Sequence, residues 1–177
     1  YPPQQHLAQS QLTADAATHL SNTRPCVREG YATSFTYGGD LNFTNQASYL
    51  YATGWQGLLW QRNLRFDTPP ADWGYDDAVM CDFFADRVIE LDAAGRPFLA
   101  GLLTLSSHTP FDVPYGRFDN KVLNAMAFTD ECIERMVGRL KDSPAWENLL
   151  LVLVADHGYP YPDGIAYNTP PRHRIQL

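Results

Sequence analysis

The sequence has no tract rich in lysine and arginine, and its formal net charge is −7. Proteins that bind nucleic acid need clustered cations to replace the counterions of the phosphate backbone. The acidic balance therefore argues against nucleic acid as a partner. An anionic substrate would need a bound metal or a few well-placed cations.

Long apolar runs are missing as well. The longest one is far shorter than the roughly 20 residues that a helix needs to span a bilayer, and the first residues lack the pattern of a signal peptide. We expect this stretch of chain to be soluble, whatever holds for the full product of its gene.

Cysteine is scarce, with only Cys26, Cys81 and Cys132 in 177 residues. An odd number of widely spaced cysteines matches neither a CxxC metal site nor a disulfide framework, so we interpret all three as packing or incidental thiols. With 45% hydrophobic residues, the chain can bury a core, and it is most simply one domain or a large piece of one.

Three β-favouring runs alternate with helical patterns. The strands are predicted at residues 31–37, 98–105 and 149–155, and the last two are apolar enough to be buried on both faces. Helices are predicted from Asp40 or Asn42 to Thr53, from Asp76 to Gly95 and from Asn120 to Lys141, with 61–75 as a loop. Strand and helix in alternation predict an α/β fold with a mostly parallel sheet flanked by helices.

Asp156 and His157 directly follow the third predicted strand. Ligands of open α/β sheets collect beyond the carboxyl ends of the strands. A carboxylate with an imidazole suits Zn²⁺ or Mn²⁺ better than Ca²⁺. The alternative is an aspartate that caps a turn beside a surface histidine.

His108 follows the strand predicted at 98–105, in the segment LSSHTPF at 105–111. Pro110 favours an extended Thr109 and so stiffens the loop. A fixed imidazole can donate to a phosphate or sulfate oxygen or protonate a leaving group. The alternative is a loop histidine bonded to a nearby carbonyl.

Two further segments could meet an anion. The glycine turn at 37–45 (YGGDLNFTN) opens a predicted helix whose backbone amides could face an anion, although such a turn is also an ordinary helix cap. Residues 172–174 (RHR) are a cationic cluster in an acidic chain, or else a solvated surface tract.

In this order, four segments resemble the sulfatase-type branch of the alkaline phosphatase superfamily, most closely its lipoteichoic-acid synthase or phosphoglycerol transferase group. They are GYATSFTYGGDLNF at 30–43, LSSHTPF at 105–111, FTD at 128–130 and VADHG at 154–158. The resemblance implies an alkaline-phosphatase-like fold, incomplete at its N-terminal side. Residues 1–177 would be a partial catalytic domain, with 1–25 an irregular lead-in and 26–177 the α/β core portion.

The resemblance also implies roles for single residues. Asp156 and His157 match the family's metal ligands, for which Mn²⁺ or Zn²⁺ is expected. His108 matches a histidine that contacts the substrate anion. Asn45 takes the position of another substrate-side group, often arginine in the lipoteichoic-acid enzymes, and His173 matches a histidine beyond the DHG motif.

One departure concerns the nucleophile. In the family a Thr, Ser or modified Cys and the remaining acidic metal ligands lie in an earlier segment that has no counterpart here. Thr33, Ser34, Thr36 and Thr109 carry hydroxyls, but none occupies a matching position. We therefore expect a fragment that lacks the nucleophile and is inactive alone.

The resemblance implies metal-dependent transfer or hydrolysis of a phospho-ester group, such as phosphoglycerol from a lipid, through a covalent intermediate. The alternatives are a sulfatase acting on sulfate esters and a non-catalytic binding domain with the same fold. The family also implies a cell-envelope enzyme with its catalytic domain outside the cytoplasm, touching the membrane through an N-terminal segment outside this sequence. A sheet that lacks a strand exposes backbone and apolar surface, so self-association is expected.

Overall fold

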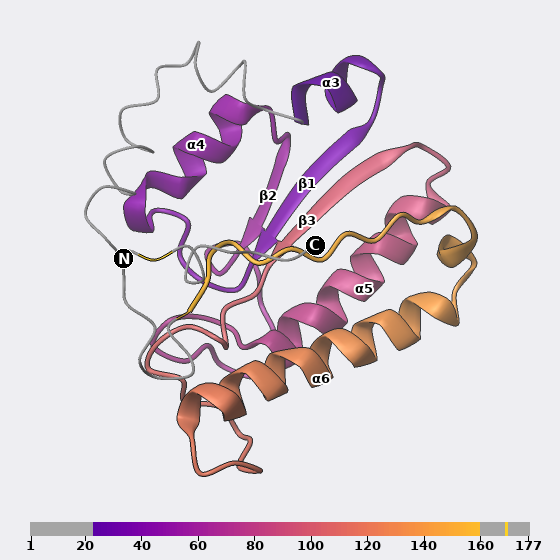
Figure 1. Ribbon diagram of the computed structural model, residues 1–177. Helices are drawn as coiled ribbons and strands as arrows, with labels where there is room; N and C mark the ends of the chain where they lie inside the picture. Colours follow the sequence, from indigo (N-terminus) through magenta and orange to yellow (C-terminus); the bar gives the residue numbers. More distant parts are fainter. Residues whose placement is uncertain (1–22, 160–168, 170–177) are drawn as a thin grey trace. The chain divides into compact units, whose positions relative to one another are not determined.

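The computed structural model describes residues 23–159 and 169, and its chain divides into two units, Tyr1–Trp146 and Glu147–Leu177. The first unit contains a three-stranded sheet in the order β2-β1-β3 (Figure 1). Its strands are β1 (Ala32–Tyr37), β2 (Gly57–Trp60) and β3 (Phe98–Leu103). Both pairings of β1 are parallel. The predicted α/β fold with a parallel sheet is confirmed.

Strand β2 is a structural element that the sequence analysis missed. It has four residues, GLLW, and β1 pairs with it from Ser34 opposite Gly57 to Tyr37 opposite Trp60. So short a run carries little periodicity, and its place at the edge of the sheet comes from tertiary pairing. Strands β1 and β3 lie where the sequence predicts them.

Two long helices also lie where they are predicted. Helix α5 (Asp77–Ala93) begins with the Asp76 carboxylate accepting a hydrogen bond from Val79 N at 3.0 Å. Helix α6 (Lys121–Lys141) begins with the Asn120 side chain accepting from Leu123 N at 3.1 Å. Such caps satisfy amides that have no partner inside the helix. The remaining helices are α3 (Thr23–Arg28), η1 (Phe43–Asn45), α4 (Gln46–Thr53) and η2 (Pro144–Asn148).

The helix after the glycine turn starts later than predicted. Helix α4 begins at Gln46, and the Asp40 carboxylate instead accepts the Asn42 amide at 2.8 Å within the preceding turn. Asp40 therefore stabilises a local turn, as aspartate often does. The helix ends at Gly54, whose φ is 107°, as predicted.

The two faces of the sheet carry different apolar clusters. Leu58 and Trp60 of β2 and Leu50 of α4 belong to one, together with Phe35 of β1. The other joins Met80 of α5 to side chains of β2 and β3 such as Leu59 and Leu102. Alternate residues of a strand point to opposite faces, so α4 and α5 cover opposite sides of the sheet (Figure 1).

Helix α6 packs along α5 on the side away from the sheet (Figure 1). Arg135 of α6 holds Asp82 of α5 through two hydrogen bonds of 3.0 and 3.1 Å. Cys81 and Cys132 are buried free thiols, and burial raises the pKa of Cys81 to about 12 and that of Cys132 to about 11. They stay protonated near neutral pH and serve packing, as predicted. Cys26 is a half-buried free thiol.

The strand predicted at 149–155 is wrong. In the second unit these residues form no strand and pair with no neighbour within the described part of the chain. Their side chains are largely exposed, with 85% of Leu150, 60% of Val152 and 57% of Val154 accessible. An apolar run gains free energy when it is buried, but a β-strand also needs backbone hydrogen bonds to a neighbouring strand. Within residues 23–159, no helix combines the length and apolar character that crossing a membrane requires.

We predict that Gly38→Ala destabilises the first unit, because the added Cβ would lie 2.3 Å from the Tyr75 carbonyl oxygen. Overpacking of this kind costs about 1–3 kcal/mol or more. The matched control is Gly138→Ala in α6, where nothing lies within 4 Å of the added carbon; it should stabilise by up to about 1 kcal/mol. Urea unfolding of both variants measures the difference, and equal effects would contradict the close approach at Gly38.

Candidate functional site

The carboxyl ends of the three parallel strands lie together at one end of the sheet, which we call the carboxyl edge. The glycine turn at Gly38 and Gly39 follows β1, and the loop that carries His108 follows β3. The turn is bound tightly, because the Gly38 carbonyl accepts from Tyr75 N at 3.0 Å and the Gly39 carbonyl accepts from Gln61 N at 3.4 Å. Three separate loops therefore meet where α/β proteins place their ligands.

His108 is half-buried at this edge. Its Nδ1 lies 2.7 Å from the Thr109 carbonyl oxygen. A carbonyl can only accept, so Nδ1 carries the proton of this bond. The alternative reading, a loop histidine bonded to a carbonyl, thus describes one nitrogen of the ring.

An aromatic pair stands beside His108. The Trp73 ring lies 5.5 Å from the imidazole, and the Phe43 ring lies 6.1 Å from Trp73. Trp73 is 48% exposed and Phe43 58% exposed. Trp73 follows the prolines of the predicted loop, and the sequence analysis missed it as a site residue. The signal that could have found it was a tryptophan beside a glycine in such a loop.

Asn45 lies at the same edge, two residues after Phe43. It is exposed, with φ at 60°, and precedes the first residue of α4. Its amide donates to the Asn42 carbonyl at 3.1 Å. The structure thus brings the segment of Asn45 and the loop of His108 together through Phe43 and Trp73.

Asp77 is a functional candidate that the sequence analysis missed. It begins α5 and is only 1% exposed. Its carboxylate accepts hydrogen bonds from Leu105 N at 2.7 Å, Ser106 N at 3.1 Å and Thr129 Oγ1 at 2.7 Å. The signal in the sequence was the pair of aspartates at the start of α5, of which only Asp76 was needed as a cap.

The Asp77 carboxyl is under two opposing influences. Burial raises its pKa above the ordinary value of 3.8, and the hydrogen bonds from Leu105, Thr129 and Ser106 lower it in part. The net direction is upward, because removing a carboxylate from water penalises its charged form.

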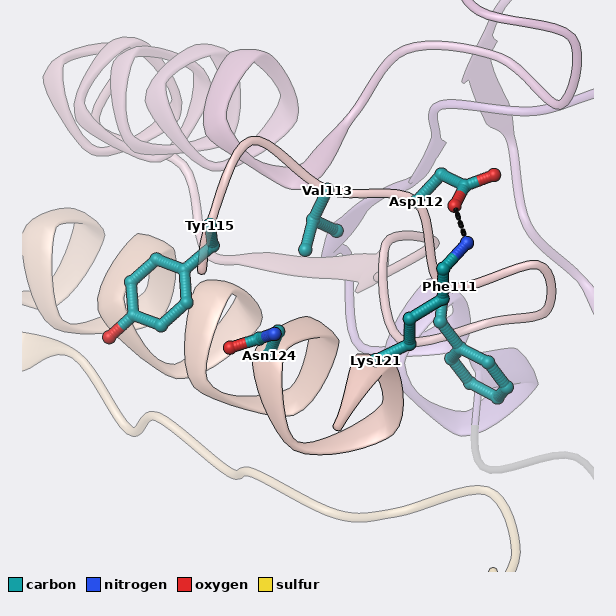
Figure 2. Close-up of a pocket in the computed structure, with 6 residues that line it drawn as sticks. All are labelled: Phe111, Asp112, Val113, Tyr115, Lys121 and Asn124. Atoms are coloured by element: carbon teal, nitrogen blue, oxygen red, sulfur yellow. Dashed lines mark hydrogen bonds and ion pairs between the residues drawn. The ribbon is translucent and has the colours of Figure 1, made fainter. Parts of the chain in front are cut away.

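A hollow of about 410 Å³ adjoins the His108 loop. It lies between residues 111–115 and the first turns of α6 (Figure 2). Across it, Lys121 Nζ and the Asp112 carboxylate form an ion pair of 2.6 Å. The lining residues are Phe111, Asp112, Val113, Tyr115, Lys121 and Asn124.

Asp156 and His157 lie in the second unit and form a local pair. The carboxylate accepts the His157 amide at 2.9 Å, and its other oxygen lies 3.5 Å from His157 Nε2. The Nδ1 atom lies 2.9 Å from the Gly158 carbonyl oxygen. Histidines that bind metals usually donate their second ring N–H to a carboxylate, a backbone carbonyl or water, and the Gly158 carbonyl is such a partner.

This donor set fits a divalent metal in part. A carboxylate oxygen and an oriented imidazole nitrogen supply two ligands of the types that Zn²⁺ and Mn²⁺ accept. Residues 23–159 and 169 contain no group of three or more such side chains that could hold a metal. A complete site would need further ligands.

The other predicted residues divide into two groups. His173 and the cationic cluster at 172–174 lie outside the described residues. Thr33, Ser34 and Thr36 are buried in β1, with Thr36 fully inaccessible. A nucleophile must meet its substrate, so burial supports the expectation that none of these three hydroxyls is one.

Comparison with known proteins places this geometry in context. A family model described as "Sulfatase" matches residues 26–176. A phosphoglycerol transferase I from Xanthomonas campestris pv. campestris is 28% identical over 146 residues, covering 73% of this chain and 20% of the relative. The lipoteichoic acid synthase-like YvgJ from Bacillus subtilis is 24% identical and covers 56% of this chain and 20% of the relative. The chain thus spans about a fifth of the length of the curated relatives it matches.

Solved structures show the same fold. A protein of the alkaline phosphatase superfamily from Vibrio parahaemolyticus superposes with a TM-score of 0.73 at 21% identity, covering 90% of this chain and 42% of the other. The lipoteichoic acid synthase LtaP from Listeria monocytogenes gives 0.73 at 20% identity, covering 85% and 40%. The predicted alkaline-phosphatase-like fold is confirmed, with this chain covering part of it.

We predict that the stability advantage of the wild type over Asp77→Asn grows as the pH falls. Because the folded-state pKa of Asp77 is raised, the folded state binds its proton more readily than the unfolded state. The contribution is complete below the unfolded value of 3.8 and is lost as the pH rises through the folded value. Urea unfolding of both proteins between about pH 7 and pH 4 isolates the effect. A difference that shrinks on acidification would mean that the hydrogen bonds outweigh burial.

Proposed function

The chain belongs to the sulfatase family, and on that premise we propose that it forms part of an enzyme that transfers or hydrolyses a phospho-ester group. Phosphoglycerol carried by a lipid is the substrate we favour, because relatives of this chain are phosphoglycerol transferases. The observation that carries the proposal is His108 beyond the carboxyl ends of the strands, on a loop anchored by hydrogen bonds to the buried Asp77 carboxylate.

The role we propose for His108 is to stabilise negative charge on the oxygens of the transferred group. A donor that is already oriented when charge develops lowers the barrier without reorganising. Phe43 and Trp73 form an exposed aromatic wall on the same side. Asn45 and His173 are the further substrate-side residues of this proposal.

Asp156 and His157 would hold a divalent metal, Mn²⁺ or Zn²⁺, together with ligands from outside this sequence. When bound, such a metal acts as a Lewis acid and activates a nucleophile. The chain's own contribution would be to orient these ligands, since the Gly158 carbonyl beside Nδ1 holds the ring with Nε2 at 3.5 Å from one Asp156 carboxylate oxygen.

The nucleophile of the proposed covalent step lies outside this sequence. The support is that the chain spans a fifth of its relatives and that its strand hydroxyls are buried. We propose that the 177 residues alone are inactive. We also propose a cell-envelope location with the catalytic domain outside the cytoplasm, and membrane contact through an N-terminal segment absent from this sequence.

The proposal predicts metal-dependent turnover of a phosphoglycerol lipid. The experiment joins this chain to the remaining catalytic segment of its enzyme and offers a phosphoglycerol lipid and an aryl sulfate side by side, with and without Mn²⁺ or Zn²⁺. Release from the lipid alone is expected. Release from the sulfate alone would instead establish a sulfatase, and silence on both with no bound metal would favour a non-catalytic binding domain.

Two variants and a matched control separate the roles in the same assay. Asp156→Ala should abolish both metal retention and turnover, whereas the exposed loop variant Asp67→Ala should change neither. His108→Ala should keep the metal and lower turnover by about 10²–10³, the usual effect of removing an oriented donor. Unchanged metal content in Asp156→Ala would refute the ligand assignment.

We further propose that the isolated chain self-associates through its exposed apolar run at 149–155. Val152 and Val154 are more than half exposed in this run. Light scattering should show a mass that rises with concentration, and the double variant Val152→Lys with Val154→Lys should reduce it. A wild-type chain that stays monomeric at high concentration would count against the proposal.

A further inference from the structure

We propose that Asp77 is a positioning residue for His108: its buried carboxylate fixes the loop that delivers the imidazole to the sheet edge. The inference rests on the proposed function only in that it takes His108 to be the group that meets the substrate anion. The juxtaposition itself is a property of the fold.

One residue connects the carboxylate to the histidine. The Leu105 amide donates to Asp77 Oδ1 at 2.7 Å. The carbonyl of the same Leu105 accepts the His108 amide at 3.0 Å. A displacement of Leu105 therefore moves the backbone of His108 directly.

Ser106 closes the junction in both directions. Its amide donates to Asp77 Oδ2 at 3.1 Å, and its hydroxyl accepts the Asp77 amide at 2.9 Å. The hydroxyl thus accepts a hydrogen bond from one of the first amides of α5, as a helix-cap residue would, although Ser106 is 29 residues away in the sequence. Two opposed bonds fix both the distance and the rotation of the loop relative to the helix.

Thr129 anchors the carboxylate from the other side. Its hydroxyl, on α6, donates to Asp77 Oδ2 at 2.7 Å. The carboxylate is thereby held by groups from the β3 loop and α6 while it stands on α5. With donors on both oxygens, it cannot rotate without losing a bond.

The chemistry of the site calls for a carboxylate. The two loop amides and the threonine hydroxyl all point donors at it, and an ionised carboxyl is acceptor-only on both oxygens. The side-chain NH₂ group of an asparagine at this position would face one of these donors instead of accepting a hydrogen bond from it. Burying a charge is costly unless every bond is made, so a carboxylate kept here is better explained by loop placement than by core packing.

The first test needs no variant. Hydrogen exchange followed by NMR on the full chain should show the Leu105 and Ser106 amides exchanging within about tenfold of the β3 amides, although both residues lie beyond the end of that strand. Exchange of these two amides at the rate of unprotected loops would overturn the proposal, and this outcome does not depend on whether any variant folds.

The second test compares Asp77→Asn with Asp82→Asn. Asp82 lies on the same helix and pairs with Arg135, so its loss loosens the contact between α5 and α6 without touching the loop. Asp77→Asn should speed exchange of the Leu105 and His108 amides by about tenfold or more and shift the His108 ring signals. Asp82→Asn should lower the melting temperature and leave those signals in place. Equal behaviour of the two variants would refute a positioning role.

Turnover supplies the functional readout in the complete enzyme. Asp77→Asn should lower kcat for the lipid substrate by about tenfold or more, the loss expected for one bond to a charged group, with a smaller change in KM. Asp82→Asn should keep both parameters. A wild-type enzyme that turned over neither ester would refute the proposed function, whereas the exchange and ring-signal results would still decide the role of Asp77.

Discussion

The parallel pairing of β1 with both of its neighbours is the constraint on which the first unit depends. Parallel strands cannot be joined by a tight turn, so each connection must cross over through a longer segment. Helices α4 and α5 lie in these connections and cover the two faces of the sheet. The same pairing sends all three strands out at one edge. The glycine turn, the Trp73 loop and the His108 loop meet there because the strands share a direction.

At that edge, backbone groups do most of the positioning. Gly38 and Gly39 let neighbouring segments of the chain approach to hydrogen-bond distance. An added Cβ at Gly39 would lie 2.9 Å from the Trp73 carbonyl oxygen. Asp77 holds the third loop from beneath. Its burial raises its pKa, which means that the folded protein gives up some electrostatic stability to keep it. A carboxyl at odds with its surroundings is expected where precise placement matters more than stability.

The sequence predicted what depends on local pattern. Asp76 and Asn120 cap their helices as expected, and β1 lies where β-branched and aromatic residues alternate. The start of α4 was misplaced because Asp40 has a nearer partner, the Asn42 amide, than any helix amide. Asp77 was missed for a different reason. Its partners at 105, 106 and 129 are distant in sequence, and no local pattern encodes such contacts.

The two apolar runs show the same limit from the other side. Residues 98–105 and 149–155 have similar composition, and the sequence predicts both as buried strands. The first became β3 because β1 offers it a free edge over six residues, from Ala32 opposite Phe98 to Tyr37 opposite Leu103. The second run pairs with no strand within the described residues, although its side chains are apolar. The hydrophobicity of a segment thus indicates how much free energy it would gain by being buried in a sheet. Whether it pairs depends on backbone groups elsewhere, and the Asp156 and His157 pair at the end of the run keeps its own geometry through bonds to its immediate neighbours.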